Sequence, residues 1–454
     1  MAMNNGASTS NNRKRRAEHP SSLIAAVSES EPHSKYTIYM LNFIKKRMGI
    51  DMPPQQSSFR YPFIHDVVNY DKLLKIGQGT FGEVFKARCK KTQRFVALKK
   101  ILMENEREGF PITAIREIKM LQRLRSDYIT ELIEICNTKC SKTQDKSTFY
   151  LVFTYCDFDL AGLLSHPNLN LKIQDIKCMM KHLLDGLFRI HSVNILHRDM
   201  KTANILVTNE GVLRLADFGL SRNMPKSNKP INYTNRVVTL WYRPPELLLG
   251  SRRYGPAIDL WGVGCIMAEL WTHTPILQGD TEQKQLELIQ NMCGGINTAV
   301  WPSVDQLPLF HKMALNPDKR RVLGDRMTAI IEKSRPLPEN EALREQNIKA
   351  ALQLIDQLLT LDPTQRIEAN KALDEDFFFI DPPPPQNIRH VVEKMPKNIF
   401  EFTSGRGAHA GRNRNNMVRA GANNQNHQVA NGTDRRARPY SKNPADTQMT
   451  DIVY

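Results

Sequence analysis

The chain lacks the features that mark membrane, secreted and disulfide-bonded proteins. No apolar run approaches the roughly 20 residues that a membrane-spanning helix needs. The first residues are polar and then basic, with no apolar segment after them, so we expect no secretory signal. The seven cysteines are an odd number, spread from Cys89 to Cys293 without a CxxC pair. We therefore expect reduced thiols, no disulfide scaffold, no structural zinc site and no membrane association.

The excess of positive charge is greatest at the two ends of the chain. There are 63 Lys and Arg against 47 Asp and Glu, a formal net charge of +16. Residues 1–60 contain nine bases and four acids, and residues 386–454 contain eleven bases and five acids. Because both segments have few residues that can form a core, we predict a mostly disordered N-terminal extension and a disordered Asn-, Gly- and Arg-rich tail.

Each end leaves one functional question open. The Arg13–Arg16 run is either a nuclear-import signal or a solvated basic segment. The basic tail is either an unspecialised flexible segment or a weak RNA contact, because positive charge attracts nucleic acid without specifying a fold.

A glycine-rich turn lies between two strand patterns, residues 70–76 and 83–89. Its glycines are Gly77, Gly79 and Gly82. A GxGxxG pattern is weak by itself, and in dinucleotide-binding folds it opens a helix. Here the residues after Gly82 continue as a strand, which favours a hairpin whose backbone amides can approach phosphates closely.

A lysine on the next predicted strand, residues 95–101, is a candidate phosphate ligand. Ala97 and Lys99 face the same side because strand side chains alternate. An isolated lysine is more commonly a surface residue, but a helix predicted to start near Pro111 contains Glu117, which is placed to reach Lys99. A partly buried pair of this kind is costly to break, so it can hold the lysine and act as a switch.

Two charged motifs follow a predicted buried helix over residues 173–191. The first reads His197-Arg198-Asp199-Met200-Lys201-Thr202-Ala203-Asn204, and the second is Asp217-Phe218-Gly219. Together with the glycine turn, Lys99 and Glu117, they resemble the motifs of the eukaryotic protein kinases in order and spacing. The resemblance covers roughly residues 64–380.

The resemblance implies an α+β, bilobal protein kinase fold. It predicts a small β-rich N-lobe with one key helix over about residues 64–155, and a larger, mainly helical C-lobe over about residues 157–380. The two basic ends flank this kinase domain.

The resemblance also assigns the chemistry. Phosphoryl transfer depends on positioning and charge neutralisation. Asp199 is implied to accept the proton of the attacking hydroxyl. Lys201 is implied to neutralise the transferred group, and a lysine at this position is typical of serine/threonine kinases. Asn204 and Asp217 are implied to supply oxygen ligands to Mg²⁺.

The implied cofactors are ATP and Mg²⁺. Lys99, paired with Glu117, would hold the α- and β-phosphates. The turn implied to cover the phosphates consists of Gly77, Gln78, Gly79 and Gly82. The residues implied to surround the adenine are Ile76, Val84, Ala97, Phe153, Thr154, Cys156 and Leu206, and Asp159 is a further implied cofactor-binding residue. For the aliphatic residues of this set, core packing is an alternative explanation, and the two can hold together.

Other segments resemble one kinase family in particular. Residues 111–117, Pro-Ile-Thr-Ala-Ile-Arg-Glu, resemble the cyclin-binding helix of the cyclin-dependent kinases, and residues 233–246 are equally similar to that family. Residues 99–105 and the polar loop near 137–148 resemble the members that act in transcription elongation. The resemblance implies a cyclin partner, T-like, docked on the helix that contains Ile115.

Thr234 lies where cyclin-dependent kinases are phosphorylated in the activation segment. Three cationic side chains are expected to converge on it, Arg116, Arg198 and Arg222. Without the phosphate these cations repel one another, and a phosphate would tie three separate segments together.

The end of the activation segment is implied to bind substrate. Val237 and Val238 are expected to form an apolar ledge that favours proline after the acceptor Ser or Thr. By analogy with the family, Glu246 pairs with Arg366, and Asp259 anchors the catalytic loop.

The implied function is nuclear. The kinase would phosphorylate the C-terminal domain of RNA polymerase II and elongation factors, and so promote elongation. Another transcriptional or cell-cycle cyclin-dependent kinase is the first alternative. A nucleic-acid-binding adaptor that uses the basic ends, with the kinase fold as a scaffold, is the second.

Overall fold

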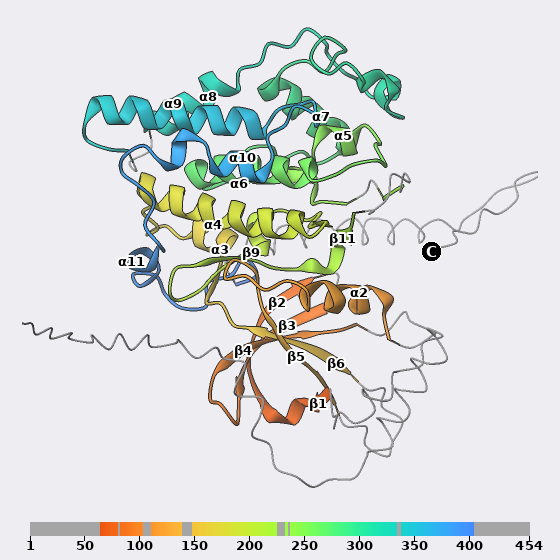
Figure 1. Ribbon diagram of the computed structural model, residues 1–454, viewed down its shortest axis with the longest axis vertical. Helices are drawn as coiled ribbons and strands as arrows, with labels where there is room; N and C mark the ends of the chain where they lie inside the picture. Colours follow the sequence, from red (N-terminus) through yellow and green to blue (C-terminus); the bar gives the residue numbers. More distant parts are fainter. Residues whose placement is uncertain are drawn as a thin grey trace, which may run out of the picture.

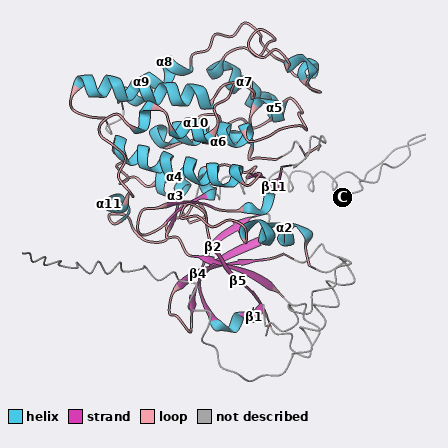
Figure 2. Cartoon of the chain, in the orientation of Figure 1, coloured by secondary structure: helices cyan, strands magenta, loops and turns pink. Residues whose placement is uncertain are grey.

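The computed structural model describes residues 64–79, 82–102, 110–138, 148–224, 232–234, 237–333 and 337–403. Strands gather in one lobe and helices in the other (Figure 1, Figure 2). The predicted bilobal α+β fold is therefore confirmed. The extension over residues 1–60, with its Arg13–Arg16 run, and the tail from residue 404 lie outside the described residues. Within the described ranges, no helix is long and apolar enough to cross a membrane.

The N-lobe contains one six-stranded sheet with the order β1-β5-β6-β4-β3-β2. Only β1 and β5 pair in parallel, and the other neighbours are antiparallel. The strands are β1 (Ile64–Asp66), β2 (Tyr70–Gly79), β3 (Gly82–Cys89), β4 (Phe95–Lys100), β5 (Leu132–Asn137) and β6 (Phe149–Thr154), with a short helix η2 (Val67–Asn69) between β1 and β2.

The hairpin predicted around the glycines is the β2–β3 pair, in which Gly79 lies opposite Gly82. Gly82 has a φ of +140°, and a Cβ at this position would lie 2.0 Å from the carbonyl oxygen of Lys100. Only glycine fits such a close approach of two backbones. The turn therefore lies against the end of β4, the strand that contains Lys99.

The key helix of the N-lobe is α2 (Ile112–Leu121). Pro111, predicted within the first turn, is the residue that caps it. Ala114 and Ile118 pack in a small apolar cluster with Leu151 of β6. This packing turns the same face of α2, including the buried Glu117, towards the sheet.

Two long helices form the centre of the C-lobe, α4 (Ile173–Ser192) and α6 (Ala257–Thr272). The predicted apolar face of α4 is buried, and α6 is buried around nearly its whole circumference. The other α-helices are α3 (Leu160–Ser165), α5 (Pro245–Leu248), α7 (Glu282–Cys293), α8 (Leu323–Lys333), α9 (Glu341–Leu358), α10 (Ala369–Leu373) and α11 (Arg389–Val392), and the short helices η6 (Val304–Gln306), η7 (Phe310–Lys312) and η8 (Asp376–Phe378) join them.

Short elements between the lobes hold the two charged motifs. β7, β9 and β10 form a three-stranded sheet, and β8 pairs with β11. These strands are β7 (Phe158–Asp159), β8 (Ile195–Leu196), β9 (Ile205–Val207), β10 (Leu213–Leu215) and β11 (Arg222–Asn223), and the accompanying short helices are η3 (Thr202–Asn204), η4 (Phe218–Leu220) and η5 (Leu240–Tyr242).

The prediction of a disordered tail from residue 386 is wrong for residues 386–403. His182 of α4 contacts the carbonyl oxygen of Gln386 at 3.0 Å, and Phe400 is only 4% exposed. The buried Ile388, Val392 and Phe400 are spaced irregularly among polar residues, so no period revealed them in the sequence. The segment thus continues the kinase domain back to the N-lobe, where the Asn398 side chain accepts a hydrogen bond from Lys86 at 2.8 Å.

Candidate active site

Lys99 lies between two carboxylates from different lobes. Its Nζ is 2.9 Å from Glu117 Oε1 of α2 and 2.8 Å from Asp217 Oδ1. The predicted pair of Lys99 and Glu117 is therefore confirmed. The second contact links the β4 strand directly to the Asp-Phe-Gly motif, so one ammonium group fixes the relative position of α2, the sheet and the C-lobe.

The charges of this trio stabilise one another. Burial lowers the pKa of Lys99, but the nearby carboxylates of Asp217 and Glu117 outweigh it and raise the pKa above its ordinary value. Burial alone would raise the pKa of Asp217, whereas the charge and hydrogen bond of Lys99 lower it to about 2. Both groups are therefore ionised at neutral pH.

Asp199 is the centre of a second cluster. It is 5% exposed. Its Oδ2 accepts a hydrogen bond from Asn204 Nδ2 and lies 2.8 Å from Lys201 Nζ. Its Oδ1 accepts hydrogen bonds from the backbone N–H and the hydroxyl of Thr239 at 3.2 and 3.1 Å. The three residues predicted as catalytic or metal-binding in this motif are thus in mutual contact.

Thr239 was missed by the sequence reasoning. Its hydroxyl also accepts a hydrogen bond from Lys201 Nζ at 3.2 Å, so it joins the activation segment to the catalytic loop. The only signal was its place directly after Val237 and Val238 in a family-like run. Nothing in that run distinguishes a threonine that contacts Asp199 from one that faces solvent.

The residues predicted to hold Mg²⁺ fit that ion chemically. Asn204 Nδ2 donates to Asp199, which leaves the amide oxygen as its atom for a cation. Asp217 contributes an ionised carboxylate, and Mg²⁺ prefers a small number of such hard oxygen ligands together with substrate phosphates. Within the described ranges no group of three or more His, Cys, Asp or Glu is arranged to hold a metal by itself, so the phosphates would have to complete the coordination.

Most of the predicted adenine-binding residues lie on neighbouring strands of the N-lobe sheet. Ala97 of β4 pairs with Phe153 of β6, and Val84 of β3 pairs with Lys99. Ile76 lies on β2, and Leu206 lies on β9 in the other lobe. Cys156 follows β6 and is buried, which raises the pKa of its thiol to about 12. Gln78 and Gly79 lie at the end of β2, and Thr154 ends β6.

Asp159 uses its carboxylate inside the chain. It accepts a hydrogen bond from the backbone N–H of Gly162 at 2.6 Å, which caps α3, and another from Glu401 at 2.8 Å. Burial raises the pKa of Asp159 to about 7, although the backbone donors oppose this shift. The structure thus places this predicted cofactor-binding residue against the segment that returns from the C-lobe.

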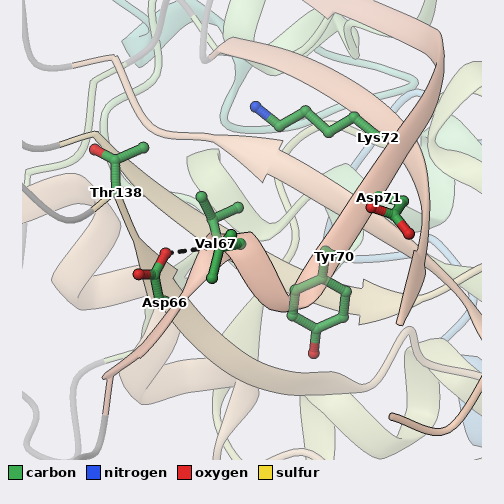
Figure 3. Close-up of a pocket in the computed structure, with 7 residues that line it drawn as sticks. Asp66, Val67, Tyr70, Asp71, Lys72 and Thr138 are labelled. Carbon is green, nitrogen blue, oxygen red and sulfur yellow. Dashed lines mark hydrogen bonds between the residues drawn. The ribbon is translucent and has the colours of Figure 1, made fainter. Parts of the chain in front are cut away.

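A surface pocket of about 550 Å³ lies away from this chemistry, on the outer side of the N-lobe. Its lining residues are Asp66, Val67, Val68, Tyr70, Asp71, Lys72 and Thr138 (Figure 3). None of them is a predicted catalytic or ATP-binding residue. Lys72 donates to the hydroxyl of Tyr150 and lies over two aromatic rings, which gives this region a structural role in the sheet.

The catalytic loop is anchored to α6 through Asp259, as predicted. Asp259 accepts hydrogen bonds from the backbone N–H groups of His197 at 2.9 Å and Arg198 at 2.8 Å. His191 also contacts this carboxylate at 2.9 Å. Arg198 has a φ of +67°, which is costly for a side-chain-bearing residue, and the two bonds to Asp259 hold it there.

The predicted pair of Glu246 and Arg366 is also present. Arg366 donates to both carboxylate oxygens at 2.7 and 3.0 Å, and both side chains are almost fully buried. Arg366 donates further to the carbonyl oxygens of Thr360 and Ala257 and lies over the ring of Trp261. The end of the activation segment is thereby fixed to the C-lobe core.

Thr234 is exposed and is linked to one of the predicted arginines, Arg198, through Tyr254. Its carbonyl oxygen accepts a hydrogen bond from the hydroxyl of Tyr254, which in turn accepts one from Arg198 at 2.9 Å. Burial lowers the pKa of Arg222, and the positive charges of Arg198 and Arg116 lower it further. The three arginines are therefore close enough to repel one another. Tyr254 was not predicted as part of this group.

Val237 and Val238 do not form the exposed apolar ledge that the sequence predicted, because their side chains are 5% and 6% exposed. The distinctive feature of these two residues is the conformation of their backbone. Val238 has a φ of +67°, and Arg243 donates to the carbonyl oxygens of both residues at 3.0 Å. Periodicity and composition contain no signal for such a backbone conformation.

The fold and these clusters define a protein kinase. The sequence profile described as protein kinase domain matches residues 70–378. The chain is 50% identical over 416 residues to the probable cyclin-dependent kinase 9 of Caenorhabditis elegans, which covers 87% of this chain and 84% of the relative. It is 52% identical over 354 residues to cyclin-dependent kinase 9 of Homo sapiens, which covers 77% of this chain and 91% of the relative.

A solved structure gives the same result. The yeast RNA Pol II CTD kinase CTDK-1 complex contains a chain that matches with a TM-score of 0.60 and 36% identity, over 74% of this chain and 99% of the other. The chain belongs to the protein kinase family and, within it, to the cyclin-dependent kinases related to cyclin-dependent kinase 9. It is a serine/threonine protein kinase, and this family uses ATP with Mg²⁺.

Proposed function

We propose that this kinase, bound to a T-like cyclin, phosphorylates Ser-Pro sites in the C-terminal domain of RNA polymerase II and in elongation factors, in the nucleus. The observation that carries the substrate preference is the backbone of Val238. The similarity to cyclin-dependent kinase 9 and to a CTD kinase complex supports the identity of the substrate.

The preference follows from hydrogen bonding. The Val238 carbonyl oxygen already accepts two hydrogen bonds from Arg243, at 3.3 and 3.0 Å, so it has no lone pair left for a bound peptide. A substrate residue with an N–H group after the acceptor would lack a partner there, whereas proline has no N–H to satisfy. A buried donor without an acceptor costs about 1–3 kcal/mol.

We propose specific roles for the clustered residues. Asp199 accepts the proton of the attacking hydroxyl, and Lys201, 2.8 Å from it, neutralises the transferred phosphoryl group. Asn204 and Asp217 would hold Mg²⁺, which supplies charge neutralisation at the phosphates when bound. Lys99, fixed by Glu117, would bind the α- and β-phosphates beneath the glycine hairpin.

The proposed cyclin site is the outward face of α2. Ile112 is 55% exposed and Ile115 is partly exposed on this helix, while Glu117 on the other face contacts Lys99. A partner that covers Ile112 and Ile115 would bury apolar surface and hold α2 in the position that keeps Glu117 on Lys99. We therefore propose that the cyclin acts by stabilising this contact.

The substrate proposal predicts a ratio of rates. The kinase co-purified with its native cyclin should phosphorylate a peptide of the polymerase repeat with Ser-Pro about tenfold to a hundredfold faster than a matched Ser-Ala peptide, measured as kcat/KM. A peptide with Ser-Gly is the control for proline rigidity, since it also retains the N–H. Equal values for the Ser-Pro and Ser-Ala peptides would contradict the proposed preference, and a co-purifying partner other than a cyclin would contradict the proposed assembly.

The activation switch predicts a second result. Thr234→Ala should lower the kcat of the cyclin-bound kinase about a hundredfold, because Arg116, Arg198 and Arg222 then repel one another without a phosphate to bind. Wild-type kinase treated with phosphatase should show the same loss, and re-phosphorylation should restore only the wild type. Full activity of Thr234→Ala would exclude the switch.

If the chain is instead another transcriptional or cell-cycle cyclin-dependent kinase, its kcat/KM in the same assay should be higher for Ser-Pro peptides from other proteins than for the peptide of the polymerase repeat. A role of the tail in RNA binding concerns residues after 403, outside the described residues. It would be tested by RNA affinity of the full chain against a chain ending at residue 403.

A further inference from the structure

Three buried polar side chains connect the catalytic loop, the activation segment and α6. Thr202 follows Lys201 directly, Tyr242 ends η5 three residues after Thr239, and Glu269 lies on α6. They are 2%, 4% and 0% exposed. They come from segments far apart in the sequence and meet beneath the groups that contact Asp199.

The polar contacts among them close a ring in which two hydroxyl protons serve three contacts. The Tyr242 hydroxyl donates to Glu269 Oε2 at 2.6 Å, and the Thr202 hydroxyl lies 3.2 Å from Glu269 Oε1 and 3.1 Å from the Tyr242 hydroxyl. Burial raises the pKa of Tyr242, and the Glu269 carboxylate raises it further, so the phenol remains a donor. The Thr202 hydroxyl therefore lies within hydrogen-bond distance of two groups on different elements, and its one proton is donated to either of them.

We propose that Thr202 is a positioning residue that fixes the distance between the catalytic loop and the substrate-binding end of the activation segment. Thr202 lies between Lys201 and Asn204 of the catalytic loop, and its hydroxyl can both donate and accept a hydrogen bond. The inference goes beyond the proposed function, because it depends on kinase activity and not on the identity of the substrate.

Thr202 matters because it lies between the catalytic loop, which contains Asp199, and the part of the activation segment proposed to bind the substrate peptide. On one side of Thr202, Lys201 contacts Asp199 and Thr239. On the side of Tyr242, the next residue, Arg243, orients the Val237 and Val238 carbonyl oxygens. A shift of η5 relative to the catalytic loop would move the peptide hydroxyl away from Asp199, and a misplacement of about 1 Å can cost about a hundredfold in rate.

The test uses Thr202→Val in the cyclin-bound kinase, because valine keeps the branched shape and loses only the hydroxyl. With a degenerate Ser/Thr peptide mixture as substrate, we expect kcat to fall about tenfold or more, while the KM for ATP changes less than twofold. Thr202→Ser, which retains the hydroxyl, should restore kcat. The matched control is Thr208→Val, which removes a buried hydroxyl that accepts a hydrogen bond from Val212 N–H in the β9–β10 turn.

A role limited to stability would give another pattern. If Thr202→Val and Thr208→Val lowered kcat equally, or if Thr202→Val retained wild-type kcat, the proposal would be overturned. Tyr242→Phe provides a second test, and its single-variant arm does not depend on the folding of Thr202→Val. If Thr202 acts through Tyr242, Tyr242→Phe alone lowers kcat, and adding Thr202→Val lowers it by less than the product of the two single effects. Independent, multiplicative effects would also reject the proposal.

Discussion

Asp217→Asn and Asp199→Asn are each expected to lower kcat by about three orders of magnitude while the protein remains folded. Asparagine preserves the shape and some of the hydrogen bonds. Asp217→Asn removes the charge that contacts Lys99 and that would face bound Mg²⁺, whereas Asp199→Asn removes the proposed acceptor for the substrate proton. Because Lys99 lowers the pKa of Asp217 to about 2, the wild-type carboxylate is ionised above about pH 4. Asparagine has no ionisable group, so raising the pH should not restore the activity of either variant.

A binding measurement separates the two roles. Asp217→Asn should weaken Mg²⁺-dependent binding of ADP, measured by calorimetry at fixed Mg²⁺, whereas Asp199→Asn should bind ADP and Mg²⁺ as the wild type does. Asp185→Asn, which alters a partly exposed pair with Lys181, is the control and should leave kcat unchanged. Near-native turnover by either active-site variant would disprove its assigned role.

Arg366→Ala is expected to lower the free energy of unfolding by about 3–5 kcal/mol. The Arg366 guanidinium and the Glu246 carboxylate are 0% and 3% exposed, so removal of the arginine leaves a buried charge without its partner. The carbonyl oxygens of Thr360, Leu361 and Ala257 also lose the hydrogen bonds that Arg366 donates to them. Denaturant unfolding monitored by tryptophan fluorescence measures the change.

A double variant distinguishes the lost partner from lost volume. Glu246→Leu combined with Arg366→Met removes both charges and should destabilise the protein less than Arg366→Ala does. Arg320→Ala breaks an exposed pair with Asp325 and should change the free energy of unfolding by no more than about 1 kcal/mol. If Arg366→Ala behaved like Arg320→Ala, the buried pair would not be important for holding the activation segment.

The sequence located most of the charged groups because their chemistry limits which residues can be used. A phosphate-binding hairpin needs glycines at fixed places, and the β4 strand must turn Ala97 and Lys99 to one side. The period of the α4 helix likewise exposed its buried face. These are local properties, so they could be worked out before any contact was known, and the Lys99–Glu117 pair was predicted from them. The Glu246–Arg366 pair followed from the family resemblance.

Other features were beyond the sequence because they depend on contacts between distant segments. The return of residues 386–403 to the N-lobe depends on Lys86 and Asp159, more than 200 residues earlier. The function of Thr239 depends on where η5 lies against the catalytic loop, and the conformation of Val238 depends on Arg243. No pattern in a linear stretch contains this information.

By itself, the sequence determined the kinase class and the bilobal fold and predicted the reacting groups, because the order and spacing of its motifs resemble those of the protein kinases. Only the tertiary structure decided which groups face one another. It showed that Asp217 shares Lys99 with Glu117, that the Val237 and Val238 side chains are buried, and that Thr202 meets Tyr242 and Glu269. The physical reason is that burial and hydrogen bonding are decided by packing among segments that are remote in the chain, and packing is a property of the whole fold.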